Sequence, residues 1–189
     1  MENTVIEARH LTTAELNAGL AHILESPSDV GVLKMIARRP AIEARELLEE
    51  AELSLTEGLV GDNWGTRGNQ MSPKRTPNPD TQLTLMNARV ADLVATTQDR
   101  WPLAGDQLYV DFDLSLNNLP AGTRLSIGSA IIEVTNEPHT GCKKVVERFG
   151  MNAMEFVNSP QGKQHCLRGI NTRVVQAGTI HIGDQITKA

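Results

Sequence analysis

The spacing of apolar residues predicts four helices along this chain. The first has the clearest start, because Thr12 and Glu15 have the spacing of a capping box and an apolar helical face follows them. Pro27 then ends this helix. The same period near 3.6 residues predicts helices over residues 41–55, 87–96 and 151–158.

Short runs of β-branched and apolar residues predict strands between and after these helices. Two of them, 30–36 and 82–86, lie in the N-terminal half. The others follow in close succession over residues 124–128, 130–135, 173–176 and 179–186. Gly128-Ser129 and Gly183-Asp184 favour tight hairpin turns, because glycine adopts a positive φ without steric cost. Many short antiparallel strands are typical of a small β-barrel or a β-sandwich.

The length of the chain limits how these elements are organised. A chain of 189 residues usually forms one domain, with or without a helical appendage. We therefore expect residues 1–29 to form an N-terminal helical extension of a domain that spans residues 30–189. Within that domain, residues 63–79 contain glycines and prolines without periodicity, which indicates either a functional or a disordered loop.

The composition is that of a globular protein and argues against several classes. Apolar residues make up 40% and charged residues 22% of the chain. Aromatic residues make up only 3%, so we expect no stacking platform for single-stranded nucleic acid, and the basic residues are too few for a duplex-binding face. No apolar stretch approaches the ~20 residues of a membrane-spanning helix, and the first residues do not resemble a signal peptide. Two cysteines without a secretory signal predict a cytoplasmic protein with free thiols.

The net charge of −5 is unevenly distributed along the chain. Residues 1–62 hold 12 acidic and 5 basic side chains, whereas residues 63–189 hold 11 and 13. Cations gathered in an otherwise acidic protein indicate a small anionic ligand. Each lysine or arginine taken singly is equally typical of a solvated surface.

One cysteine has neighbours that are suited to thiol chemistry. Cys142 follows His139 and is followed by Lys143, Lys144 and Arg148. Nearby cations stabilise the thiolate, which is the reactive form of sulfur in attack and in metal ligation. His139 is a candidate general base, or a residue that orients the thiol. These residues leave three alternatives open for Cys142: a nucleophile, a metal ligand and an inert buried thiol.

A zinc site is the competing interpretation for the cysteines. His139, Cys142, His165 and Cys166 offer four potential ligands. Structural zinc pairs are usually separated by at least two residues, whereas His165 and Cys166 are adjacent and point to opposite faces of an extended chain. The spacing therefore argues against zinc.

Two further positions carry candidate ligand groups. Arg168 is a candidate anion clamp, because a guanidinium offers a bidentate fork to phosphate or carboxylate. Asp62, which follows Gly61, is either a turn residue or a ligand-facing carboxylate, and the glycine favours the turn. No P-loop or Gly-x-Gly-x-x-Gly pattern occurs, so nucleotide binding has no support.

Five short motifs occur in a consistent order over residues 30–188. They are Gly58-Leu59-x-Gly61-Asp62, Thr140-Gly141-Cys142, Arg148-Phe149-Gly150, Arg168-Gly169-Ile170 and Gly178…Gly183-Asp184. This ordered set resembles the MOSC domain, which is found at the C-terminus of molybdenum cofactor sulfurases. The resemblance implies an α+β, β-rich fold, with an irregular closed or partly open antiparallel β-barrel and peripheral helices.

The resemblance also implies a function for the candidate residues. Cys142 would carry sulfur as a persulfide or would be the ligand of the molybdenum centre. His139 stays the second candidate catalytic residue on the ground of its position near the thiol. The anionic pterin cofactor, molybdopterin, would be bound by Arg168, Lys143, Lys144, Arg148, Thr140, Asp62 and Asn171. A sulfur transferase, or a component of a molybdenum-dependent reductase system, is the activity that this implies.

Several expectations about partners follow from the same resemblance. The sulfurases also contain a pyridoxal-phosphate desulfurase domain, and we expect none in this chain. A sulfur donor or a redox protein would then be the partner, and neither nucleic acid nor a membrane is expected. The alternatives are a cofactor carrier without catalysis and a Cys–His thiol enzyme that acts on another substrate.

Overall fold

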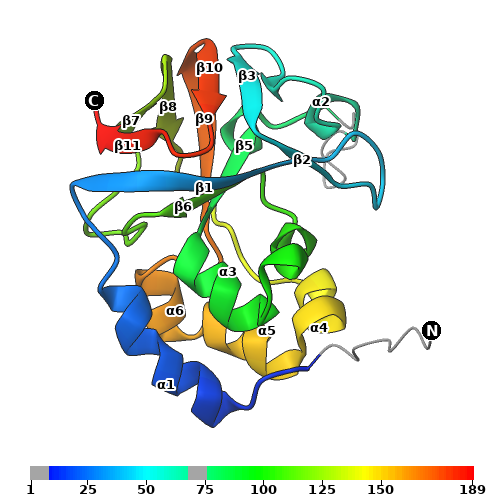
Figure 1. Cartoon of the computed structure of the whole chain (residues 1–189), viewed down its shortest axis with the longest axis vertical. Coiled ribbons are helices and arrows are strands. Elements are labelled where there is room, and N and C mark those ends of the chain that lie inside the picture. The colour runs from blue at the N-terminus through cyan, green and yellow to red at the C-terminus, as the bar shows by residue number, and fades with distance from the viewer. Residues whose placement is uncertain (1–8, 68–75) are drawn as a thin grey trace.

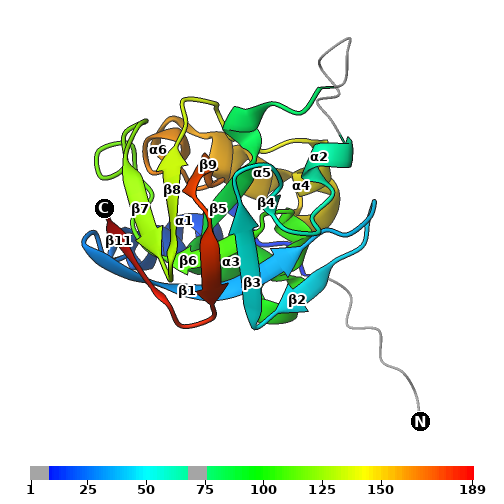
Figure 2. The same ribbon diagram turned by 90° about the horizontal axis from the view of Figure 1, so that it is seen from above.

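Seven strands close into a β-barrel in the computed structural model, which describes residues 9–67 and 76–189 (Figures 1 and 2). The barrel closes because β1 (Val30–Arg38) pairs with β11 (Gln185–Lys188) along one edge and with β6 (Leu108–Asp111) along the other. The remaining barrel strands, in spatial order from β11, are β7 (Arg124–Ile127), β8 (Ala130–Val134), β9 (Ile170–Gln176) and β5 (Leu83–Asn87). The expected β-rich barrel with surrounding helices is confirmed, and the barrel is closed.

One strand pair departs from the expected antiparallel arrangement. β5 and β6 run parallel, with Leu85 opposite Leu108 and Asn87 opposite Val110. A parallel pair needs a crossover, and here the chain crosses through α3 (Ala88–Ala95) and the 3-10 helix η2 (Gln98–Ala104).

The predicted helix over residues 41–55 is wrong, because this segment forms two strands. β2 (Glu46–Leu48) extends the barrel sheet beyond β1, and β3 (Glu50–Ser54) forms a small second sheet with β4 (Gly58–Leu59) and β10 (Gly178–His181). Along β3, Ala51 and Leu53 are buried while Glu50 and Glu52 are exposed. This alternation of buried and exposed side chains is what a strand needs when only one face of its sheet is covered. The burial of Ala51 and Leu53 in the sheet outweighs the helical propensity of Glu, Leu and Ala.

The two predicted hairpin turns have different outcomes. Gly128-Ser129 joins β7 to β8, in which Ile127 pairs with Ala130, so this hairpin is confirmed. Gly183-Asp184 lies between β10 and β11, which belong to different sheets. That turn therefore passes the chain from the small sheet back to the barrel rather than closing a hairpin.

Most of the helices gather at one end of the barrel (Figure 1). They include α1 (Thr13–Leu24), α4 (Lys143–Phe149), α5 (Met151–Asn158) and α6 (Pro160–Gln164). The capping box that starts α1 is present, since the Thr12 hydroxyl and the Glu15 carboxylate bond each other's backbone N–H groups. The sequence predicted α1, α3 and α5, but it did not predict α4 or α6.

Two apolar clusters hold the fold together by removing apolar surface from water. One fills the barrel, with Phe112 and Ile132 fully buried in it. The other lies between the barrel end and the helices, and it includes Leu16 and Ile23 of α1 together with Phe156 of α5. The N-terminal helix is thus packed into the same core as the C-terminal helices, and the boundary between residues 29 and 30 stays a prediction.

The segment predicted as a loop over residues 63–79 is described only in part. Its beginning forms the short helix α2 (Trp64–Arg67), and its end enters the 3-10 helix η1 (Pro79–Thr81). Residues 68–75 lie outside the described residues. In the described part of the chain, no helix has the length and apolar character needed to span a membrane.

Candidate functional site

Cys142 is exposed at the start of α4. It occupies the N-cap position with an extended backbone, and its carbonyl oxygen accepts the N–H of Val145 at 2.9 Å. The backbone before it is fixed by Asn158 of α5, whose side-chain oxygen accepts the Gly141 N–H at 2.8 Å and whose amide donates to the Gly141 carbonyl at 3.0 Å. A Cβ on Gly141 would lie 3.0 Å from Val157. The glycine at this position therefore permits a close approach of α5, and the thiol is held at the surface.

The predicted cations beside Cys142 lie on α4 and have carboxylate partners. The Lys144 ammonium is 3.0 Å from one Glu43 oxygen, and the Arg148 guanidinium is 2.8 Å from the other. Lys144 and Arg148 hold the pKa of the Glu43 carboxyl below its usual range. Lys143 is 90% exposed and lies 3.9 Å from Glu147. Two of the three cations thus face the loop that precedes β2.

His139 lies beside a buried ion pair that the sequence did not indicate. Arg168 donates to Asp106 Oδ2 at 2.6 Å and to the Ala104 carbonyl at 2.8 Å, and the Asp106 side chain has no exposed surface. His139 Nδ1 is 3.6 Å from Asp106 Oδ1, and both atoms are buried without a hydrogen-bond partner among residues 9–67 and 76–189, as is Arg168 Nε. Burial and the Arg168 charge lower the pKa of the His139 imidazole to about 3, against a smaller opposite effect of Asp106.

Gly169 and Asn171, which follow Arg168, shape the space that the His139 ring occupies, and we call this space the seat of His139. Gly169 has a φ of +105°, and a Cβ there would lie 2.3 Å from the Leu85 carbonyl oxygen and 3.3 Å from His139 Nδ1. Asn171 donates its side-chain N–H to the carbonyl of Glu137 at 3.2 Å, and it lies 3.4 Å from that of Pro138. Glycine is needed here both for its backbone conformation and for the space that the imidazole fills.

A cavity of about 430 Å³ lies next to this seat, between the barrel and α5–α6. Four of the predicted site residues line it: His139, Thr140, Arg168 and Asn171. The lining does not include Cys142, Lys143, Lys144, Arg148 or Asp62. The predicted site residues therefore divide into a group on the cavity wall and a group at the surface of α4, and residue 140 connects the two.

The second cysteine, Cys166, lines the cavity, whereas Cys142 does not. Cys166 has a φ of +48° and is partly buried, and burial raises the pKa of its thiol to about 11, with a further increase from Asp113. His165 lines a different cavity, so the adjacent pair does face two directions. Within the described ranges, no three His, Cys, Asp or Glu side chains are grouped so that they could hold a metal ion.

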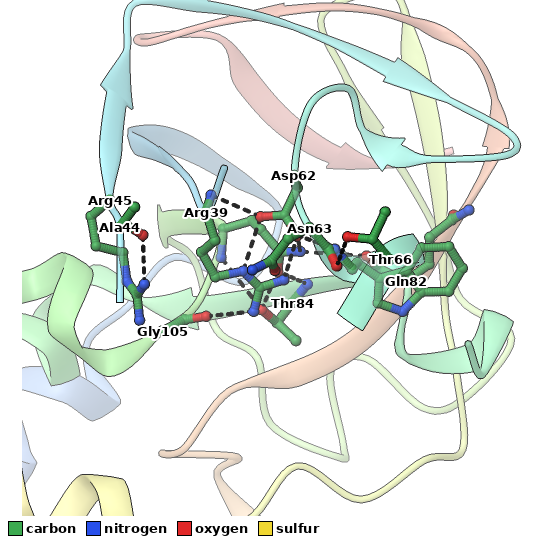
Figure 3. A network of polar contacts seen from close by, with 11 residues as sticks. Arg39, Ala44, Arg45, Asp62, Asn63, Thr66, Gln82, Thr84 and Gly105 are labelled. Atoms are coloured by element: carbon green, nitrogen blue, oxygen red, sulfur yellow. Dashed lines mark hydrogen bonds and ion pairs between the residues drawn. The ribbon is translucent and has the colours of Figure 1, made fainter. Parts of the chain in front are cut away.

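Asp62 forms a network inside the protein (Figure 3). Its Oδ2 accepts the backbone N–H and the Nε–H of Arg39, both at 2.9 Å, and its Oδ1 accepts Arg39 Nη2 at 2.8 Å and the Trp64 N–H at 2.9 Å. The Asp62 side chain has no exposed surface, and Arg39 also donates to the Gly105 carbonyl at 2.9 Å. The carboxylate therefore fixes the start of α2 and the end of β1, and both of its oxygens are occupied.

Asp106 is the residue of this site that sequence reasoning missed. It stands alone between η2 and β6, and the only local signal is the preceding Gly105, which has a φ of +90°. A single Asp after a Gly is typical of a turn. Its partners His139 and Arg168 come from segments that are distant in the sequence, so only the folded chain identifies it.

Comparisons with known proteins agree with this fold. The family model described as the MOSC domain matches residues 72–187. The crystal structure of the YuaD protein from Bacillus subtilis aligns with a TM-score of 0.62 at 13% identity, over 83% of this chain and 94% of that chain. YiiM from Escherichia coli aligns with a TM-score of 0.53 at 17% identity, over 84% and 69% of the two chains. YiiM from Geobacillus stearothermophilus gives 0.52 at 12% identity, over 84% and 73%.

These matches differ in what they establish. No curated protein matches the sequence of this chain. At identities below one fifth, the likeness to the solved structures concerns the fold. The family model, in contrast, covers more than half of the residues. This chain therefore belongs to the MOSC domain family.

Proposed function

We propose that this protein binds the molybdenum cofactor and that Cys142 carries sulfur or contacts the molybdenum centre. The observation that supports this most directly is the exposed thiol of Cys142 at the start of α4, in a chain of the MOSC family. A carrier thiol must be reached both by its sulfur donor and by the acceptor. A buried inert thiol, which the sequence left open, does not meet this requirement.

The residues around Cys142 fit an anionic cofactor with a soft metal. Thiolate sulfur is a soft ligand, and Lys143 and Lys144 place two exposed ammonium groups on the first turn after it. Thr140 lines the cavity, two positions before the thiol in the chain, and offers a hydroxyl. These four residues would hold the cofactor, which supplies redox chemistry and sulfur ligation at the metal when bound.

The sulfur step proposed for Cys142 is a thiolate exchange. The Cys142 thiolate attacks the outer sulfur of a persulfide on a donor protein. A new S–S bond forms at Cys142, the S–S bond of the donor breaks, and the donor leaves as its own thiolate. The number of electrons is unchanged, so no oxidant is needed.

The alternative of a Cys–His thiol enzyme has less support from the geometry. His139 lines the cavity, and its Nδ1 faces Asp106, whereas Cys142 is not part of that lining. An imidazole with a pKa of about 3 is also a weak base for a thiol. These two observations favour a carrier or a metal ligand over a His-activated nucleophile.

Mass spectrometry tests the sulfur step. After incubation with glutathione persulfide, we expect the Cys142 peptide of the native protein to gain ~32 Da, the mass of one sulfur atom. The gain should be absent in Cys142→Ser and present in the matched control Cys166→Ser. A gain confined to Cys166 would refute the role of Cys142.

Metal analysis separates the cofactor carrier from the sulfur carrier. The protein is produced in cells that make the cofactor, and molybdenum is measured per chain in the native protein and in Cys142→Ser. Loss of molybdenum in the variant indicates that the thiol is a ligand. Retained molybdenum with no sulfur gain in the native protein indicates a carrier module without catalysis. Absence of both molybdenum and sulfur gain in the native protein contradicts the proposal.

A further inference from the structure

The cavity beside His139 has the properties of a small-molecule site. Its volume of about 430 Å³ lies within the range of ligand pockets. Much of its wall is apolar, formed by Leu116, Leu119, Ala121, Val134, Val157 and Ile170. Charged groups lie on its lining at Glu137, Lys163 and Arg168, and Arg168 is paired with Asp106. Such a wall accommodates a ligand that is mostly apolar and has few polar groups.

One ring nitrogen of His139 is directed away from this cavity. Nδ1 is buried and faces the Asp106 carboxylate at 3.6 Å, whereas 17% of the His139 side chain remains exposed. Nε2 is not among the buried atoms without a partner, and within the described residues no hydrogen bond reaches it. The exposed part of the ring that lines the cavity therefore includes Nε2.

The Asp106 carboxylate determines which nitrogen carries the proton. A neutral imidazole has one N–H and one nitrogen with a lone pair. A carboxylate attracts the N–H and repels the lone pair, so the hydrogen lies on Nδ1, the nitrogen that faces Asp106. The present 3.6 Å separation is too long for a hydrogen bond, and a ring movement of about 0.6 Å would satisfy both atoms. With Nδ1 protonated, Nε2 presents a lone pair to the cavity.

Arg168 holds the Asp106 carboxylate that faces His139 Nδ1 and so stabilises the neutral ring with its proton on Nδ1. Its guanidinium neutralises Asp106 at 2.6 Å and donates to the Ala104 carbonyl at 2.8 Å, and its remaining Nε is buried. Burial, and then the charge of Arg168, disfavour protonation of His139, and its pKa of about 3 keeps the ring neutral at physiological pH. Gly169 leaves room for the ring, and Asn171 holds the carbonyl groups just before it.

We propose that this cavity binds a small, largely apolar molecule that donates one O–H or N–H to His139 Nε2. Asp106, Arg168, Gly169 and Asn171 are positioning residues that fix the ring and its tautomer. The ligand class follows from a neutral acceptor on a largely apolar wall. The charge of Arg168 is compensated by Asp106, and Lys163 and Glu137 carry opposite charges, so the wall does not favour an anion. The inference does not depend on sulfur or molybdenum at Cys142.

A pair of probes that differ in one donor tests this inference. Phenol has an O–H, and anisole has the same ring without a donor. Binding is followed by chemical shifts of ¹⁵N-labelled protein. We expect phenol to bind at the cavity about five-fold more tightly than anisole, the ratio that one hydrogen bond supplies. His139→Phe should bring this ratio close to one, whereas His139→Gln, which keeps an acceptor, should retain part of it.

Three controls make the outcome decisive. His165→Gln alters the neighbouring histidine that lines another cavity, and it should keep the five-fold ratio. Cys142→Ser should also keep the five-fold ratio. This variant therefore distinguishes a failure of the inference about the cavity from a failure of the function proposed for Cys142. If His139→Phe does not fold, the long-range ¹H–¹⁵N spectrum of the native His139 ring decides instead. A proton on Nε2, equal binding of the two probes, or binding of neither overturns the inference.

Discussion

Asp106 and Arg168 lie 62 positions apart in the sequence and form an ion pair of 2.6 Å in which the Asp106 side chain is fully buried. Each belongs to a segment that leads into a barrel strand, β6 for Asp106 and β9 for Arg168. Asp106 faces His139 Nδ1 at 3.6 Å, and Arg168 is one of the residues that line the cavity.

Removing one member of this pair should destabilise the protein strongly. Arg168→Met leaves the Asp106 charge buried and uncompensated, so we expect the free energy of unfolding to fall by about 3–5 kcal/mol. Urea denaturation measures this. The matched control is Arg124→Met, which removes an arginine that is 60% exposed from its pair with Glu133 and should cost under about 1 kcal/mol. Equal losses in the two variants would contradict the burial of the pair.

Gly169→Ala should be more harmful than alanine at another glycine with a positive φ. Gly122 has a φ of +90° and open space around its missing Cβ, so Gly122→Ala should cost only the backbone strain of about 1 kcal/mol. At Gly169 the new Cβ meets the Leu85 carbonyl oxygen, which adds about 1–3 kcal/mol of overpacking. Thermal unfolding of both variants provides the comparison, and a smaller loss at Gly169 than at Gly122 would refute the contact.

Acid should destabilise the native protein through His139. The folded-state pKa of about 3 lies below the ordinary value of 6.5, so the unfolded chain binds a proton that the folded chain excludes. Stability is therefore lost as the pH falls from 6.5 towards 3, by up to about 1.4 kcal/mol per pH unit. The readout is the difference in unfolding free energy between the native protein and His139→Gln from pH 7 to pH 5. Because the other groups cancel in this difference, parallel curves would show that His139 titrates normally.

The two thiols should differ in their reactivity towards iodoacetamide. Cys142 is exposed, whereas Cys166 is partly buried with a thiol pKa of about 11. At pH 8, only about one Cys166 thiol in a thousand is ionised, so we expect alkylation of Cys142 to be complete first. Peptide mass mapping follows each site. In Cys142→Ser, the remaining alkylation should accelerate about ten-fold per pH unit up to pH 10, and a rate independent of pH would contradict the raised pKa.

Part of the candidate site was visible in the sequence. His139, Thr140, Arg168 and Asn171 were singled out from residue type and motif order, and the fold brings all four to one cavity. The sequence also led us to expect that Arg168 and the cations of α4 surround Cys142. The charge of a side chain, however, does not indicate which residue it pairs with in the fold. Asp106 and Glu43 supply those partners from distant segments.

Local chemistry determined what the sequence could predict about this protein. The capping box at Thr12, the turn at Gly128-Ser129 and each of the short family motifs consist of residues close together in the chain. Tertiary structure alone decided the closure of β1 onto β11, the strands within residues 41–55 and the seat of His139. These features depend on strand register and on burial next to residues far away in the sequence. A local pattern is compatible with more than one such environment, and the packed core selects one of them.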